Sequence, residues 1–251
     1  MATPRKKGFD PKSETPFKIS RSGIEQFTSC MRCFYNERRL GIAPPRTLPF
    51  TLNSAVDALL KKEFDLYRER KEPHPLMVGN NIAAVPFSHP DLEKWRTNKI
   101  GVQFHHAKTN FLVFGAVDDI WVNEQGQLIV VDYKSTAKND DITSLDSGWH
   151  FSYKRQLEVY QWLLRQNGFD VSKTCYWVYA NGDKSKDRFD ATLSFRMTVI
   201  PYEGSDKWIE KTLGKIRECI DSETLPEPSE YCDLCRFVKE VGGVSGSAKK
   251  P

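Results

Sequence analysis

The sequence predicts a mixed α/β domain with a central sheet flanked by helices, because three patterns of apolar residues follow one another. Helical spacing of apolar residues comes first, at residues 20–42 and 53–70. Runs rich in β-branched and aromatic residues, typical of strands, follow at 100–106, 111–123, 127–133, 174–181 and 191–200. Helical patterns at 153–166 and 206–222 alternate with the later strands, an order expected for a sheet covered by helices.

Local signals support the limits of these elements. A serine at position 20 or 22 can cap the first helix, and Pro44 and Pro45 end it. The short Gly-containing turn at 123–126 joins two strands into a hairpin. The stretch 71–100 is rich in Pro and His and predicts loop with short elements, including a helical turn near 92–95. The Pro-rich sequence at 225–238 is expected to be irregular.

Length and composition indicate one globular domain with polar ends. The 251 residues predict a domain at 18–241, a disordered basic tail at 1–17 and a disordered tail at 242–251. Lys and Arg number 37 against 33 Asp and Glu, a net charge of +4 that permits a nucleic-acid partner without requiring one. No apolar run approaches the roughly 18–20 residues that span a membrane, and no secretory signal is visible, so we expect a cytoplasmic protein.

The most informative residues lie on the predicted hairpin. Asp118 belongs to its first strand, and Asp132 and Lys134 lie two apart on its second, so both point to one face. Asp132 follows the apolar run LIVV, and a charge at the end of a buried strand is costly unless it is paired or binds a metal. Asp-x-Lys alone is usually a surface ion pair of little energetic value. Two carboxylates suit Mg²⁺ or Mn²⁺, a lysine can orient the attacking water, and the Tyr133 carbonyl can complete the shell.

In this order the residues resemble the PD-(D/E)XK nuclease superfamily, in the RecB-like exonuclease type that includes the CRISPR-associated iron–sulfur exonucleases. Gln156 and Tyr160 match the Q-x-x-x-Y element of that type, one helical turn apart on one face. The resemblance spans about 20–240 and implies a restriction-endonuclease-like fold. It also implies that the glutamine–tyrosine face is turned to the active site and the nucleic acid. Many relatives place a metal-binding His in the second helix, and Asp57 stands near that position here.

Four of the six cysteines form two C-x-x-C pairs at opposite ends of the chain, Cys30 with Cys33 and Cys232 with Cys235. Such spacing is typical of metal ligands, and four thiolates suit either Zn²⁺ or a [4Fe–4S] cluster. In the iron–sulfur relatives a further late cysteine would fall on Val241, so this sequence departs from their pattern. Small buried thiols are the alternative. A metal here would join the terminal segments.

The predicted function is metal-dependent hydrolysis of phosphodiester bonds, by a DNA exonuclease of repair, recombination or defence. Single strands or ends of DNA are the expected substrate. No helicase motif is present, so an unwinding or defence-complex partner would be a separate chain. The alternative is a non-catalytic nucleic-acid-binding or scaffold module in which the cysteine site is structural.

Overall fold

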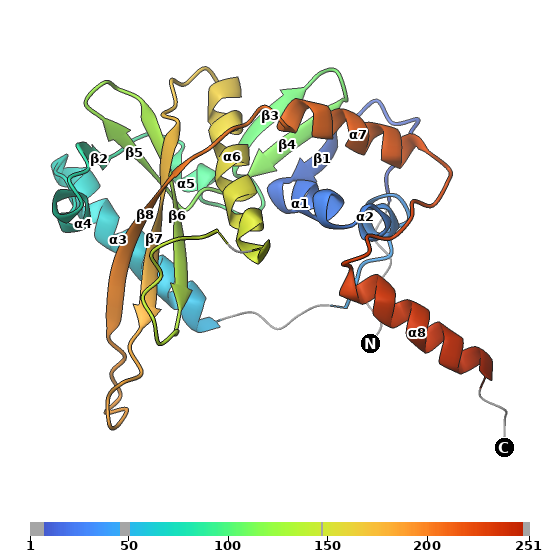
Figure 1. Cartoon of the computed structure of the whole chain (residues 1–251). Helices are drawn as coiled ribbons and strands as arrows, with labels where there is room; N and C mark the ends of the chain where they lie inside the picture. Colours follow the sequence, from blue (N-terminus) through green and yellow to red (C-terminus); the bar gives the residue numbers. More distant parts are fainter. Residues whose placement is uncertain (1–7, 46–50, 147, 248–251) are drawn as a thin grey trace. The chain divides into compact units, whose positions relative to one another are not determined.

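The computed structural model describes residues 8–45, 51–146 and 148–247 and divides the chain into two compact units (Figure 1). The first unit combines Met1–Thr47, His105–Leu112 and Glu210–Pro251, and the second combines Leu48–Phe104 with Val113–Ile209. The two ends of the chain therefore share one unit, and the predicted site residues from Asp57 to Tyr160 share the other.

The strands and helices give the mixed α/β class that the sequence predicts. The strands are β1 (Phe17–Ser20), β2 (Ala84–Pro86), β3 (Val102–His106), β4 (Phe111–Gly115), β5 (Asp119–Asn123), β6 (Leu128–Thr136), β7 (Thr174–Gly182) and β8 (Phe195–Glu203). The helices are α1 (Arg21–Ser29), α2 (Met31–Arg38), α3 (Thr51–Arg70), α4 (Pro75–Gly79), α5 (Leu92–Trp95), the 3₁₀ turn η1 (Gly148–His150), α6 (Phe151–Gln166), α7 (Ile209–Asp221) and α8 (Asp233–Ser247).

A five-stranded sheet of order β2-β5-β6-β7-β8 forms the centre of the second unit. The predicted hairpin is confirmed, since β5 and β6 pair antiparallel with Asp119 opposite Val131. β6 and β7 are parallel, with Asp132 opposite Trp177, and the intervening connection contains α6. The remaining pairs are antiparallel, so the sheet is mixed.

The two faces of β6 carry different side chains because successive residues of a strand point to opposite faces. Ile129, Val131 and Tyr133 enter the hydrophobic core, which also contains Leu60 and Phe64 of α3. Val130, Asp132 and Lys134 alternate with them and point to the other face, where α6 supplies the partner of Asp132. Helix α3 therefore covers one face, and the candidate carboxylate lies on the other.

A buried ion network lies on the α3 face. Asp119, at the start of β5, has no exposed surface and binds the guanidinium groups of Arg68 and Arg96. Asp65 of α3 pairs with both arginines, and the Tyr133 hydroxyl donates to Asp119 Oδ2 over 2.8 Å. Each buried charge thus has an opposite charge, which offsets its desolvation.

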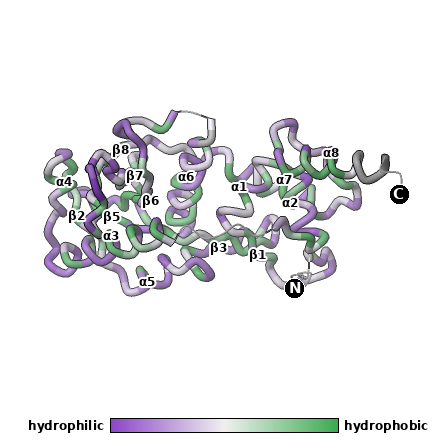
Figure 2. The backbone as a smooth tube through the Cα atoms, turned by 90° about the horizontal axis from the view of Figure 1, so that it is seen from below, coloured by the Kyte–Doolittle hydropathy of each residue, from purple (hydrophilic) through white to green (hydrophobic). Residues whose placement is uncertain are grey.

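In the first unit, β1 belongs to a three-stranded sheet of order β1-β4-β3, and the tip of the β3–β4 hairpin is part of this unit. Ser20 caps α1 as predicted, because its side chain accepts a hydrogen bond from the Gly23 amide. His106 at the hairpin tip bonds Glu210 over 2.9 Å. Figure 2 follows the hydropathy of the backbone, including the hydrophobic positions of α8.

Two predicted elements are divided in the structure. The helix predicted at 20–42 is two helices, because Cys30 adopts an extended conformation (φ −160°) between α1 and α2. The strand predicted at 111–123 breaks into β4 and β5 at residues 116–118. The stretch 71–100 contains short elements as expected, namely α4, β2 and the helical turn at Leu92–Trp95.

The chain ends also differ from the predictions. The 225–238 segment was expected to be irregular, but α8 begins at Asp233 and continues to Ser247, inside the tail predicted at 242–251. Phe9, inside the tail predicted at 1–17, is buried, and its amide donates to the Arg38 carbonyl over 2.7 Å. Residues 1–7 and 248–251 of the two predicted tails lie outside the described residues. Within the described part of the chain, every helix is too short or too polar to cross a membrane.

Replacing Arg68 with methionine should destabilise the second unit. Asp119 would keep Arg96 and Tyr133 but lose half of its opposing charge inside the core, so we expect a loss of roughly 3 kcal/mol of unfolding free energy. Urea denaturation, followed by circular dichroism, measures this loss of unfolding free energy. Arg70→Met, an exposed position of the same helix, is the control, and equal stability of the two variants would contradict the assigned role of the network.

Candidate functional site

Asp132 is the centre of the candidate site. It lies on β6, is fully buried, and accepts a hydrogen bond from Gln156 Nε2 over 2.7 Å at Oδ1. Its second oxygen, Oδ2, forms an ion pair with the Lys134 ammonium, and no other described group donates a hydrogen bond to it. A buried carboxylate oxygen with one contact retains the capacity to bind a cation, which fits the hard oxygen ligands that Mg²⁺ takes.

Asp118 lies beside Asp132 at the end of the neighbouring strand. Because Asp119 is opposite Val131 in the antiparallel ladder, Asp118 falls opposite Asp132. Asp118 Oδ2 accepts a hydrogen bond from the Tyr133 amide over 2.9 Å. The amide and carbonyl of one residue in a strand point toward the same neighbour, so the Tyr133 carbonyl also points to the side of Asp118. We refer to the Asp118 and Asp132 carboxylates and this carbonyl together as the oxygen cluster, or carboxylate cluster.

Burial raises the pKa of Asp132 to about 7, even though Lys134 acts in the opposite direction. The Asp118 carboxylate beside it adds to the rise, since a like charge disfavours ionisation. Burial alone would lower the pKa of Lys134, but the Asp132 and Asp118 carboxylates outweigh it and raise that pKa. The two carboxylates thus carry more negative charge than Lys134 alone neutralises.

Lys134 is held on two sides. Its ammonium pairs with Asp132 and lies 4.6 Å from the centre of the Tyr153 ring, within cation–π range. Tyr153 lies on the first turn of α6, and Gln156 follows one turn later. The α6 helix therefore contacts both members of the Asp-x-Lys pair.

The predicted glutamine–tyrosine pair is directed to the same place. Gln156 and Tyr160 are both buried, and Gln156 Nε2 donates to the Tyr160 hydroxyl over 3.1 Å as well as to Asp132. The structure thus brings Asp118, Asp132, Lys134, Gln156 and Tyr160 into one connected group within the second unit.

Asp57 and an additional lysine, Lys61, approach the group from α3. Asp57 Oδ2 accepts from Lys61 Nζ over 2.8 Å, and the same ammonium lies 3.5 Å from Asp118 Oδ1. Asp57 thus reaches Asp118 through Lys61. Lys61 was not predicted, although its i,i+4 spacing from Asp57 was a usable signal. Asp119, Arg68 and Arg96 were not predicted either, because their contacts join residues far apart in the chain.

The four predicted cysteines form a second cluster, in the first unit. The Sγ atoms of Cys30, Cys33, Cys232 and Cys235 all lie within 4.8 Å of one another. Cys33 Sγ is 3.5 Å from Cys232 Sγ and 3.5 Å from Cys235 Sγ, and Cys30 Sγ is 3.8 Å from Cys235 Sγ. A disulfide needs about 2.0 Å, and the thiols are free. The arrangement is a set of four converging sulfur ligands.

The thiols of this cluster cannot all ionise together without a cation. Burial favours the neutral thiol of Cys30, but hydrogen bonds from the Ser229 and Cys33 amides and from neighbouring thiols outweigh it and lower its pKa to about 7. Burial raises the pKa of Cys235 to about 11 and raises that of Cys33 further. A bound metal would displace the remaining protons, because thiolates are the binding form.

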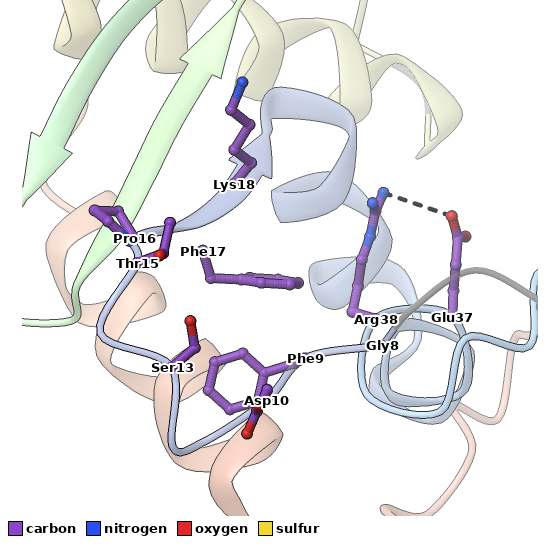
Figure 3. Close-up of a pocket in the computed structure, with 10 residues that line it drawn as sticks. All are labelled: Gly8, Phe9, Asp10, Ser13, Thr15, Pro16, Phe17, Lys18, Glu37 and Arg38. Carbon is purple, nitrogen blue, oxygen red and sulfur yellow. Dashed lines mark ion pairs between the residues drawn. The ribbon is translucent and has the colours of Figure 1, made fainter.

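A cavity of about 370 Å³ also lies in the first unit (Figure 3). Gly8 lines it, and a Cβ there would lie 2.2 Å from the Arg39 carbonyl oxygen, so only glycine fits. Lys18 and Arg38 contribute positive charge, while Arg38 pairs with Glu37 over 3.7 Å. The lining mixes both signs of charge, and the carboxylate cluster belongs to the other unit.

Comparison with known proteins relates the chain to one family. The family model described as "PD-(D/E)XK nuclease superfamily" matches residues 51–239. The chain is also similar to the solved structure titled "Crystal structure of SSO0001". The similarity covers 92% of this chain and 87% of that chain, with 16% sequence identity and a TM-score of 0.41. No curated protein matches the sequence.

The site brings two carboxylates, a backbone carbonyl and a lysine to neighbouring strand ends. The family match covers most of the chain, so the protein belongs to the PD-(D/E)XK nuclease superfamily. Members of this superfamily are typically metal-dependent nucleases, and a nucleic-acid substrate follows from membership.

The raised pKa of Asp132 predicts how stability depends on pH without metal. The native carboxyl binds its proton up to about pH 7, whereas the unfolded one releases it near pH 4. Between these values the native state holds more protons, so unfolding free energy should fall as pH rises, by roughly 2–4 kcal/mol.

The test measures the unfolding free energy of the wild type and of Asp132→Asn by urea denaturation in EDTA, at about pH 5 and at about pH 8. Asparagine cannot ionise, so the variant should lose less stability across this interval. Contributions that the two proteins share cancel in the difference. Parallel curves for the two proteins would show that Asp132 keeps an ordinary pKa.

Proposed function

We propose that this chain is a Mg²⁺- or Mn²⁺-dependent DNA exonuclease of the RecB-like type that acts on single strands or ends. The observation that carries the proposal is the buried Asp132, which shares one oxygen cluster with Asp118 and contacts both Lys134 and Gln156. An isolated surface ion pair would show neither the burial nor the second carboxylate.

Asp118, Asp132 and the Tyr133 carbonyl would hold the divalent cation. Bound there, the cation would polarise the scissile phosphate and activate a water. The protein holds these ligands before binding: the Tyr133 amide fixes Asp118, and the Gln156 amide fixes Asp132. Asp57 contacts Lys61 instead, so it would act on the cation only through that lysine or through a water.

Lys134 would orient the attacking water and stabilise charge that develops on the phosphate. Its ammonium is fixed between Asp132 and the Tyr153 ring, so little side-chain entropy remains to be lost on binding. Gln156 and Tyr160 would position Asp132 and face the nucleic acid, as the Q-x-x-x-Y resemblance implies. Repair, recombination or defence would supply the substrate, with unwinding by a separate helicase or defence-complex chain.

The proposal predicts cleavage of end-labelled linear DNA with Mg²⁺ or Mn²⁺. Asp132→Ala removes a metal ligand and should reduce turnover at least about 10³-fold, and Lys134→Ala about 10²-fold or more. Both single- and double-stranded substrates are compared, with Lys173→Ala, a lysine remote in sequence from the motif, as the control.

Circular DNA tests the exonuclease assignment, because an end-directed enzyme should leave it intact. Cleavage of the circle would indicate an endonuclease instead. A wild type that binds DNA but cuts no substrate with either metal would favour the alternative, a non-catalytic scaffold module.

For the cysteine cluster we propose a single structural Zn²⁺. Tetrahedral zinc lies about 2.3 Å from each sulfur, which places the sulfurs about 3.8 Å apart, and three Sγ pairs here lie at 3.5–3.8 Å. In a [4Fe–4S] cluster each cysteine binds a different iron, so the sulfurs must be spread more widely around the cube. The close spacing therefore favours one ion over the cluster.

Elemental analysis of protein purified without added metal should find one zinc per chain and no stoichiometric iron. The double variant Cys33→Ser/Cys235→Ser should lose the zinc and part of the thermal stability, because metal binding contributes to folding. Cys219→Ser, outside the cluster, should keep both. Stoichiometric iron with visible charge-transfer absorption would contradict the zinc assignment.

A further inference from the structure

Lys61 places a second ammonium group at the carboxylate cluster. It lies on α3, and its side chain is 21% exposed. Nζ is 3.5 Å from Asp118 Oδ1 and 2.8 Å from Asp57 Oδ2. The other Asp118 oxygen is bonded to the Tyr133 amide. Lys61 therefore faces the one Asp118 oxygen that the strand backbone leaves open.

The charges of the group decide how many divalent cations it accommodates. Asp57, Asp118 and Asp132 provide three negative charges, and Lys61 and Lys134 provide two positive charges. With one divalent cation bound, the group would carry a net charge of one positive, which a single bound phosphodiester would neutralise. A second divalent cation would leave an excess of positive charge in a partly buried site, where repulsion is strong.

We propose that the site binds one divalent cation and that Lys61 takes the place of a second one, beside Asp118. This inference rests on the proposed nuclease function. In two-metal nucleases a pair of ions stabilises the attacking and the leaving oxygen of the phosphate. Here Lys61 supplies the second positive charge as a fixed ammonium group. Hydrolysis forms a bond between water oxygen and phosphorus and breaks the bond to the leaving oxygen. The attacking water gives up a proton to solvent and the leaving oxygen takes one up from solvent, and Lys61 stabilises the negative charge that develops on the phosphate oxygens in between.

Asp57 is a positioning residue in this arrangement. It lies one helical turn before Lys61, and its carboxylate holds the ammonium at a hydrogen-bond distance of 2.8 Å. When a cation binds Asp118, Lys61 keeps this second partner and stays at the site. The helix thus fixes the lysine independently of the metal.

The test counts Mn²⁺ bound to the zinc-loaded protein, by titration calorimetry and electron paramagnetic resonance, and measures cleavage at saturating Mn²⁺. Ions that disappear in Asp132→Asn are assigned to the carboxylate cluster. Lys61→Met is compared with Lys62→Met, an exposed lysine of the same helix, and with Lys61→Arg, which keeps the charge.

We expect one Mn²⁺ per wild-type chain. Lys61→Met should bind Mn²⁺ about tenfold more tightly or take up a second ion, because a neighbouring positive charge is gone. With a single ion bound, its cleavage should nevertheless fall about 10²-fold. If Lys61 were needed only for folding, Lys61→Met would instead weaken both Mn²⁺ binding and cleavage. Lys61→Arg should keep one ion and more of the activity, and Lys62→Met should match the wild type.

Two cluster ions in the wild type, wild-type cleavage by Lys61→Met with a single bound ion, or weaker Mn²⁺ binding by that variant would each overturn the inference. A wild type that binds one ion but cleaves no DNA would contradict the proposed nuclease function. The ion count and the affinity change in Lys61→Met then still decide whether Lys61 excludes a second cation.

Discussion

The arrangement of the second unit depends on how two adjacent strands bury carboxylates at the point where their ladder ends. Asp119 and Asp132 have no exposed surface, yet they point to opposite faces of the sheet. Asp119 receives two guanidinium groups and a tyrosine hydroxyl, so its charge is balanced. Asp132 receives one lysine and one amide beside a second carboxylate, and its pKa rises. The balanced carboxylate is structural, and the under-neutralised one is suited to a cation.

Tyr133 connects the two faces. Its hydroxyl bonds Asp119 in the ion network, while its amide bonds Asp118 in the oxygen cluster. One residue thus couples the rigid packing against α3 to the position of a proposed metal ligand. Preorganised ligands need not be ordered during the reaction, which is the energetic advantage of building a site on strands instead of loops. The network is therefore linked to the site through Tyr133.

Local patterns were enough to predict the mixed sheet, the hairpin around residues 123–126 and the face shared by Asp132 and Lys134, because period and turn chemistry are local properties. The grouping of the two cysteine pairs followed from ligand spacing. Contacts across many residues could not be read in this way, so Arg68 and Arg96 beside Asp119 were missed. The helix break at Cys30 was missed too, since its apolar pattern continues through the break. Helix α8 was hidden by the prolines that precede it.

The two ligand clusters differ in ways that would separate two metals within one chain. Carboxylate and carbonyl oxygens are hard ligands that favour Mg²⁺ or Mn²⁺, whereas thiolates favour soft ions. The oxygen cluster keeps lysines as neighbours, so its charge is set by fixed ammonium groups as well as by the ion. The sulfur cluster joins residues about 200 positions apart, so a bound ion there would restrict the unfolded chain strongly. An exchangeable ion for chemistry and a retained ion for folding are therefore compatible, because neither cluster offers the ligands that the other ion prefers.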